Sequence, residues 1–148
     1  DVVGGTVGSL CEAYREVARV DAAGHRVNLL FDHADECIVV RSPYTHDMLE
    51  VELATAGSLA VRLPAWVNAD ALRIEGVEAA PRRSNGYLFF ARPPVGVPIR
   101  ICFPLAPQDL TLSASIHVRP IRVRLRGDAI EAMDDFGCGL TFFDPISG

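Results

Sequence analysis

The chain has 148 residues, about the size of one domain, and its hydrophobic fraction of 49% excludes a disordered tail. A net charge of −5 disfavours nucleic-acid-binding proteins that rely on phosphate contacts. Apolar runs are only a few residues long, so no membrane-spanning helix is expected. The sequence starts at Asp1 without a signal-peptide pattern, which leaves the localisation unknown.

The first predicted element is a single helix near residues 8–20. Its apolar residues, from Leu10 to Val17, recur at helical spacing. Thr6 or Ser9 is a candidate N-cap, with a glutamate three residues after Ser9, and Gly24 is expected to end the element. The sequence therefore predicts one N-terminal helix with an apolar face.

The remainder of the chain is predicted to form short β-strands. Residues 48–54 alternate between apolar and acidic, and residues 59–63 return as a second apolar strand, so a hairpin through residues 56–58 is expected. Turn residues separate all the strands, and no helical pattern interrupts them. The predicted strands cover residues 26–31, 36–41, 48–54, 59–63, 71–75, 86–91, 98–103, 110–113, 116–126, 129–133 and 140–143.

This order of elements predicts a mainly β fold, an antiparallel, jelly-roll-like β-sandwich preceded by one α-helix. Residues 1–24 are expected to end an upstream helical domain, and residues 25–148 to form the sandwich domain. The predicted core residues are Leu49, Val51, Leu53, Val61, Leu63, Ile99, Ile101, Phe103, Ile121, Val123 and Leu125.

Residues 32–36 combine two aspartates, a histidine and a glutamate. Such side chains can hold a hard cation or zinc, but a solvated turn is the favoured interpretation because Asp bonds well to its own backbone. The histidines show no metalloprotease spacing; they stand at His25, His33, His46 and His117.

Acidic and basic side chains gather near the C-terminus. A pair of carboxylates is the usual machinery of glycoside hydrolysis, yet the spacing here favours turn and surface acids. The alternating arginines Arg122, Arg124 and Arg126 indicate either an anion clamp or, more simply, the solvated face of a strand. The candidate carboxylates are Asp128, Glu131, Asp134, Asp135 and Asp144.

The sequence contains four aromatic residues that could bind a sugar, and four cysteines that could be free or paired. The aromatics can form a sugar-stacking platform, although core or domain-interface positions are favoured. The cysteines have no metal-site or redox spacing, and buried free thiols are favoured over two disulfides. The residues are Trp66, Tyr87, Phe89 and Phe90, and Cys11, Cys37, Cys102 and Cys138.

The order of several segments resembles the C-terminal part of glycoside hydrolase family 127, the β-L-arabinofuranosidase type, and its uncharacterised relatives. The resemblance covers roughly residues 1–126, and the R-x-P-x-W element followed by a strand ending in glycine is its most specific part. The segments are VNLLF (27–31), LAVRLPAWV (59–67), LRIEG (72–76), GYLF (86–89) and PIRICFPL (98–105).

This resemblance implies an upstream (α/α)6 catalytic barrel of the same polypeptide, with the present chain as a non-catalytic accessory sandwich that braces the barrel. Members of the family use a cysteine nucleophile held near a zinc by further cysteines and a glutamate, and a Cys-Cys pair supplies part of that site. The resemblance puts Val2 and Val3 at the positions of this pair. No catalytic residue and no metal or other cofactor is therefore carried over to this segment. Whether the parent protein is an active glycosidase is left open.

The alternative function is an independent carbohydrate-binding module that uses Trp66 and Tyr87. A stand-alone enzyme built on the C-terminal aspartates is a third class. Because a lone helix of this length is marginal in water, its apolar face is also expected to form a weak homodimer, which replacing Leu10 and Val17 by Glu would abolish.

Overall fold

The computed structural model describes residues 2–113, 119–136 and 142–146. The chain divides into two compact units, Asp1–Phe103 and Pro104–Gly148. The elements in chain order are α1 (Val2–Arg15), β1 (Ala18–Asp21), β2 (Gly24–Val27), β3 (His33–Ala34), β4 (Ile38–Arg41), β5 (Leu49–Leu53), β6 (Leu59–Arg62), η1 (Ala69–Ala71), β7 (Arg73–Glu75), β8 (Arg82–Ser84), β9 (Tyr87–Phe90), β10 (Ile99–Cys102), β11 (Pro107–Leu112), β12 (Ile121–Arg126) and β13 (Ala129–Met133).

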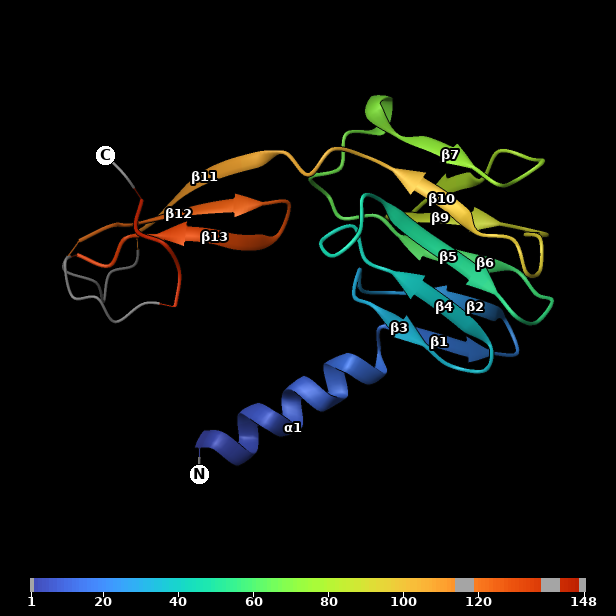
Figure 1. Ribbon diagram of the computed structural model, residues 1–148, viewed down its shortest axis with the longest axis horizontal. Coiled ribbons are helices and arrows are strands. Elements are labelled where there is room, and N and C mark those ends of the chain that lie inside the picture. The colour runs from blue at the N-terminus through green and yellow to red at the C-terminus, as the bar shows by residue number, and fades with distance from the viewer. Residues whose placement is uncertain (1, 114–118, 137–141, 147–148) are drawn as a thin grey trace. The chain divides into compact units, whose positions relative to one another are not determined.

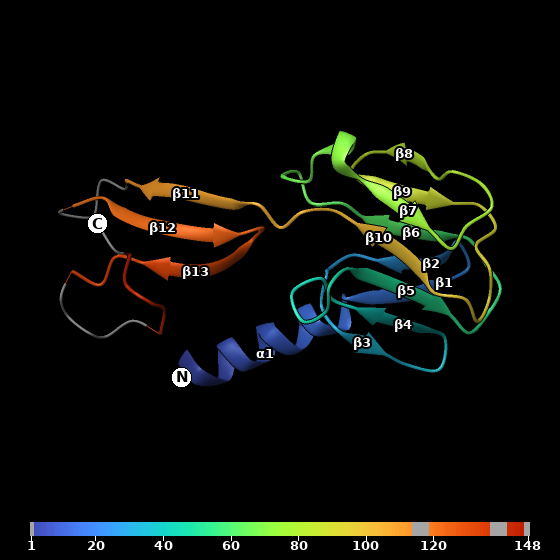
Figure 2. The same ribbon diagram turned by 45° about the horizontal axis from the view of Figure 1, so that its top comes forward.

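The first unit is a β-sandwich preceded by a helix, as the sequence predicts. Sheet A has the strand order β1-β2-β6-β9-β8 and sheet B the order β3-β4-β5-β10-β7. The two sheets lie as two layers (Figures 1 and 2). All strand pairs are antiparallel except β2 with β6, which run parallel. The sandwich strands begin at Ala18, within the segment expected to close an upstream helical domain.

One hydrophobic core fills the space between the sheets. Strand β5 shows how alternating residues build this core. Leu49, Val51 and Leu53 are fully buried, while Glu50 and Glu52 lie on the outer face. Ile99 and Val51 are directly paired neighbours in sheet B. Sheet A contributes buried residues at alternate positions in the same way, so the period-two pattern of each strand selects its inner face.

The predicted hairpin between residues 48–54 and 59–63 is wrong. Strand β5 pairs with β4 and β10 in sheet B, whereas β6 pairs with β2 and β9 in sheet A. The connection crosses from one layer to the other, and the Ser58 carbonyl accepts a hydrogen bond from the His25 N–H of β2 at 2.8 Å. Both strands have one apolar face, and placing them in opposite sheets turns the two faces toward one core.

The helix lies earlier than predicted, at Val2–Arg15. Ser9 does not cap it; its hydroxyl donates to the Gly5 carbonyl one turn back, at 3.0 Å. Val17 is fully buried, because its carbonyl accepts the Asn28 N–H at 2.9 Å and the chain enters the sandwich there. Gly24 opens β2 rather than ending a helix.

Most of the predicted core is confirmed, with three exceptions. Seven of the residues, from Leu49 to Ile101, are buried in the sandwich, and Phe103 packs on it half-buried. In the second unit Val123 is buried, but Ile121 and Leu125 are only half-buried. The reason is architectural: among the described residues, that unit has one sheet and no second sheet to cover it.

The second unit is sheet C, with the order β11-β12-β13. It confirms the strand predicted at residues 129–133 and part of those at 110–113 and 116–126. Residues 116–118 and 140–141 of the predicted strands lie outside the described residues, and Phe142 and Phe143 occupy a bend. Within the described ranges, no helix is long and apolar enough to cross a membrane.

Candidate functional site

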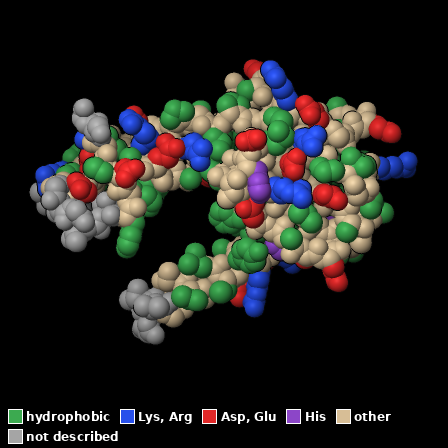
Figure 3. Space-filling model, viewed as in Figure 1, with side chains coloured by type: hydrophobic (Ala, Val, Ile, Leu, Met, Phe, Trp, Pro, Cys, Tyr) green, Lys and Arg blue, Asp and Glu red, His purple; other side chains and the backbone are tan. Residues whose placement is uncertain are grey.

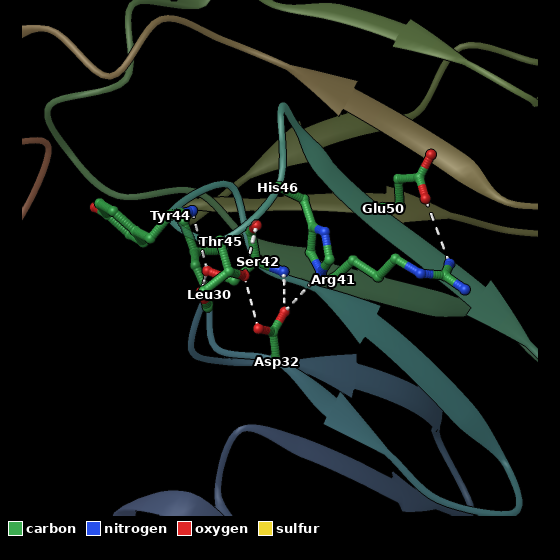
Figure 4. A network of polar contacts seen from close by, with 8 residues as sticks. All are labelled: Leu30, Asp32, Arg41, Ser42, Tyr44, Thr45, His46 and Glu50. Atoms are coloured by element: carbon green, nitrogen blue, oxygen red, sulfur yellow. Dashed lines mark hydrogen bonds and ion pairs between the residues drawn. The ribbon is translucent and has the colours of Figure 1, made fainter.

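Asp32 organises a turn on the sandwich. Its carboxylate accepts the Ser42 N–H at 2.7 Å and the Thr45 hydroxyl at 2.6 Å, and His46 Nε2 lies 3.5 Å away (Figure 4). The hydrogen bond from the Ser42 backbone, aided by that from Thr45, holds the pKa of Asp32 below its ordinary value. The Ser42 hydroxyl donates in turn to the Leu30 carbonyl. Asp32 therefore ties two loop segments together.

Asp35 has a similar local role. One carboxylate oxygen accepts the N–H groups of Cys37 at 2.8 Å and Ile38 at 2.9 Å, and the other contacts His33 Nε2 at 3.1 Å. Burial raises the pKa of Asp35, but these hydrogen bonds outweigh it and lower the pKa overall. The turn itself is confined to residues 35–37, whereas His33 and Ala34, expected within the turn, form β3 and pair with β4. Across the described ranges, no three His, Cys, Asp or Glu side chains are grouped to hold a metal.

The alternating arginines of β12 are all engaged by carboxylates. Arg122 binds Asp134 through two nitrogens, with Nη2 at 2.9 Å from Oδ1 and Nε at 3.1 Å from Oδ2. Arg124 meets Asp109 at 2.8 Å, and Arg126 meets a third acid at 3.2 Å. These pairs favour the solvated strand face over an anion clamp.

The candidate carboxylates are distributed over several roles. Asp134 pairs with Arg122, and the hydrogen bond from Arg122 lowers the pKa of Asp134. Glu131 forms an ion pair with Arg126. The backbone carbonyl of Asp144 accepts a hydrogen bond from the Met133 N–H at 3.0 Å. Asp128 lies in the turn after β12, and Asp135 follows Asp134 after β13. Asp134, Glu131 and Asp144 therefore have separate partners, in Arg122, Arg126 and the Met133 N–H.

Trp66 lies in the loop after β6. It is half-buried against the sandwich core, with its ring edge-on to Phe103 at 5.8 Å between centroids and 66° between planes. Its indole Nε1 is buried without a hydrogen-bond partner among the described residues. This setting matches the core interpretation of Trp66, while a domain-interface role and carbohydrate binding there stay predictions.

Tyr87 lies on the outer face of sheet A and is half-buried. Its hydroxyl donates to Asn28 Oδ1 at 3.0 Å, and its ring lies 6.0 Å from that of Phe89. The Asn28 side chain donates to the Glu16 carbonyl at 3.1 Å, just after α1. Phe89 points outward and is 43% exposed, whereas Phe90 points into the core.

Arginines surround these two aromatics. Strand pairing places Arg62 directly opposite Tyr87, and Arg82 directly opposite Phe89. Arg26 lies in the same row as Phe89, with Ala60 between them. We call this set, Arg26, Arg62, Arg82, Tyr87 and Phe89, the arginine–aromatic face.

A hollow of about 500 Å³ adjoins the arginine–aromatic face. Arg82 and Phe89 line it together with Arg92, and Glu78 is its acidic member. The sequence analysis named Tyr87 and Phe89 but missed the arginines, because their grouping depends on which strands are neighbours. Alternation within each strand was the available signal, since Arg62 stands between the inward residues Val61 and Leu63.

The outer face of sheet B has a different character. Glu50 binds Arg100 at 2.9 Å and Arg41 at 3.3 Å, and these hydrogen bonds and charges, led by Arg100, lower the pKa of Glu50. Figure 3 shows acidic and basic side chains interspersed on this side of the sandwich. Glu50 thus neutralises charge on two arginines of this face.

The helix α1 exposes its apolar side chains. Val7 is 53% exposed, Leu10 64% and Tyr14 53%. Together with Phe31 of the loop between β2 and β3 they line a groove of about 610 Å³ whose walls are almost entirely apolar. Figure 3 shows these hydrophobic side chains along the helix. Val17, which was expected on this face, is buried in the sandwich instead.

The described cysteines are free thiols. Cys11 is exposed on α1, against the expectation of burial, while Cys37 and Cys102 are half-buried. Cys102 lies against Met48, with 3.6 Å between their sulfurs. Cys138 and His117 lie outside the described residues.

Comparison of the chain with protein-family models finds no match, and comparison with curated proteins finds none either. The sequence resemblance and the geometry of the chain itself are thus the ground on which a function is inferred.

Proposed function

We propose that the chain is a non-catalytic accessory β-sandwich domain of a family-127-like glycoside hydrolase, and that it braces an upstream catalytic barrel through α1. The observation that carries the proposal is the exposed apolar face of α1. Every side chain from Gly4 to Glu16 is exposed, including those of Leu10 and Tyr14. A helix of about this length, without a covering partner, is marginal in water.

The attachment of α1 to the sandwich supports a bracing role. Asn28 bonds the carbonyls of Glu16 and Val17 through its side chain and its backbone, at 3.1 and 2.9 Å. Val17 is fully buried. The C-terminal end of the helix is therefore fixed to the sandwich, and the Tyr14 ring lies 5.8 Å from that of His33. Val7 and Leu10 are more than half exposed and can enter a neighbouring domain.

Sheet C offers a second incompletely covered apolar surface. Leu110 and Leu112 are directly paired with Val123 and Ile121, so the four lie on one face of the sheet. Leu110 is 42% exposed and Leu112 50% exposed. Contiguous exposed apolar side chains mark interaction surfaces in soluble proteins, which supports a role within a larger assembly.

The proposal is tested by assaying hydrolysis of aryl arabinofuranosides and related aryl glycosides. The 148-residue chain alone and the longer polypeptide with its upstream region are compared. We expect no turnover by the chain alone. Turnover by the chain alone, abolished by Asp134→Asn or Asp135→Asn, would contradict the proposal and establish a stand-alone enzyme.

The second candidate function is an independent carbohydrate-binding module. The outward positions of Tyr87 and Phe89, 6.0 Å apart, favour it because adjacent aromatic rings can stack on sugars. Calorimetry with arabinan-type and other plant oligosaccharides tests it. Saturable binding by the isolated chain supports the module, and the absence of any heat of binding excludes it for the sugars used.

A further inference from the structure

We propose that the arginine–aromatic face of sheet A binds an acidic oligosaccharide, a short glycan whose sugar rings carry carboxylates. This ligand class goes beyond the accessory role, which depends on α1 instead. The proposal rests on three arginines that have no acidic partner among the described residues and that surround two adjacent outward aromatic rings.

The first step is the row of residues through Phe89. Arg26, Ala60, Phe89 and Arg82 are directly paired across four neighbouring strands. At about 4.8 Å between strands, the two arginine backbones are about 14 Å apart. Because the neighbouring Ala60 side chain is small, it leaves the ring of Phe89 accessible to a ligand. A sugar ring stacked on Phe89 has an arginine on either side.

The second step is the neighbouring row, which holds Tyr87. Arg62 and Ser84 flank Tyr87 on the adjacent strands. The Tyr87 hydroxyl is anchored on Asn28 at 3.0 Å, so the ring is held in place before a ligand arrives. Rings that are already ordered lose little conformational entropy on binding.

The third step is the charge of the face. Within the described ranges, Arg26, Arg62 and Arg82 take part in no hydrogen bond or ion pair with another side chain. Arg100 of sheet B and Arg122 of sheet C differ from them, since each binds a carboxylate at 2.9 Å. Free guanidinium groups present forks that match a carboxylate through two parallel hydrogen bonds.

The fourth step distinguishes the ligand class. A neutral glycan would leave the three guanidinium groups without a counterpart. A long nucleic acid meets a protein of net charge −5, which opposes association with a polyphosphate. A short carboxylated glycan uses the aromatic rings and the local positive charge together, and Glu78 in the adjoining hollow is available to a sugar hydroxyl.

The test is titration calorimetry of the 148-residue chain with tetragalacturonate at low salt, beside a neutral galactan tetrasaccharide and a single-stranded RNA oligonucleotide. We expect the uronate to bind with a Kd below about 1 mM and to weaken as salt rises. Arg82→Ala and Phe89→Ala should each weaken binding about tenfold, the effect of losing one charged hydrogen-bond pair or one stacked ring.

The matched control is Arg73→Ala, which removes an exposed arginine from the edge of sheet B and should change the affinity less than about twofold. No binding of the uronate would overturn the proposal. Equal binding of the neutral glycan, tighter binding of the RNA, or equal losses from Arg73→Ala and Arg82→Ala would overturn it as well. Circular dichroism of each variant verifies that the sandwich is intact.

Discussion

At the scale of single residues, Asp32 has more influence than its exposed position indicates. It lies outside the core, yet its carboxylate accepts hydrogen bonds from the Ser42 backbone and the Thr45 hydroxyl. The N–H groups of Thr45 and His46 bond the Ser42 carbonyl within the same turn. A single carboxylate thus fixes the connection between β4 and β5 against the segment that precedes β3.

Replacing Asp32 by Asn should lower the free energy of unfolding by about 1–2 kcal/mol at neutral pH, because a charged acceptor of two hydrogen bonds is lost. Folding lowers the pKa of Asp32 below its ordinary value of 3.8. The stabilisation is therefore present above the unfolded pKa and disappears as the pH falls through the folded pKa.

Urea unfolding of both proteins at about pH 7 and about pH 2 measures this difference. The gap between Asp32→Asn and the parent chain should close at the acidic pH. Asp47→Asn, an exposed change nearby, serves as the control and should have little effect at either pH. A gap that stays constant with pH would show that the charge of Asp32 is irrelevant.

Trp66 provides a second test at this scale. Its ring packs on Phe103, but its buried Nε1 has no partner among the described residues. Trp66→Phe should therefore change the free energy of unfolding by less than about 1 kcal/mol, while Trp66→Ala should lower it by about 2–4 kcal/mol. Denaturant unfolding monitors both. Equal losses would mean that the indole N–H has a partner.

At the scale of elements, Gly24 decides how β1 and β2 join. Its φ is +114°, and an added Cβ would lie 2.6 Å from the Ser58 carbonyl oxygen. Gly24→Ala should lower the free energy of unfolding by about 2 kcal/mol or more. Gly8→Ala is the matched control, since a Cβ there meets nothing within 4 Å and alanine favours a helix.

Denaturant midpoints and far-ultraviolet circular dichroism measure the two variants. Gly24→Ala should shift the midpoint downward, and Gly8→Ala should raise the helical signal without lowering the midpoint. Identical midpoints for Gly24→Ala and the parent chain would contradict the close approach of Gly24 to Ser58.

The positions of the strands depend on local sequence, whereas their pairing depends on residues far apart in the chain. Alternation within residues 49–53 and 99–102 predicted both strands and their buried faces, because the period of a strand depends on its own residues. Pairing depends on distant residues, and the hairpin predicted for β5 and β6 failed for that reason. Strand β8 (Arg82–Ser84) escaped prediction, because a polar edge strand has no apolar period.

The candidate sites follow the same division. Tyr87 and Phe89 were found from residue type. The bonds of Asp35 to the following backbone agree with a turn at that position, but His33 and Ala34 of the predicted turn form β3. The arginines of the arginine–aromatic face come from β2, β6 and β8, which become neighbours only after the sheet has formed. Sequence spacing carries no record of that proximity.

At the scale of the whole molecule, the exposed face of α1 predicts weak self-association of the isolated chain. Leu10 and Tyr14 should meet the same residues of a second copy, most commonly in a two-fold dimer. Val7→Glu with Leu10→Glu should give a monomer with unchanged β content. Val17→Glu, once expected to do the same, should unfold the sandwich because Val17 is fully buried.

Sedimentation from micromolar to millimolar concentration, with circular dichroism of each variant, measures this behaviour. A parent chain that stays monomeric throughout the range would contradict self-association through α1. If the Val7→Glu, Leu10→Glu variant still forms dimers, the dimer contact lies on a surface other than α1.

Amide hydrogen exchange of α1 is the most direct measurement of the accessory role. In the chain alone, amides within residues 5–15 should exchange almost freely, while those of β5 and β10 stay protected. In the proposed longer polypeptide, the amides of α1 should slow by about 100-fold or more, because the accessory role requires an upstream domain to cover Leu10 and Tyr14. Equally fast exchange of α1 in both proteins would contradict the bracing role.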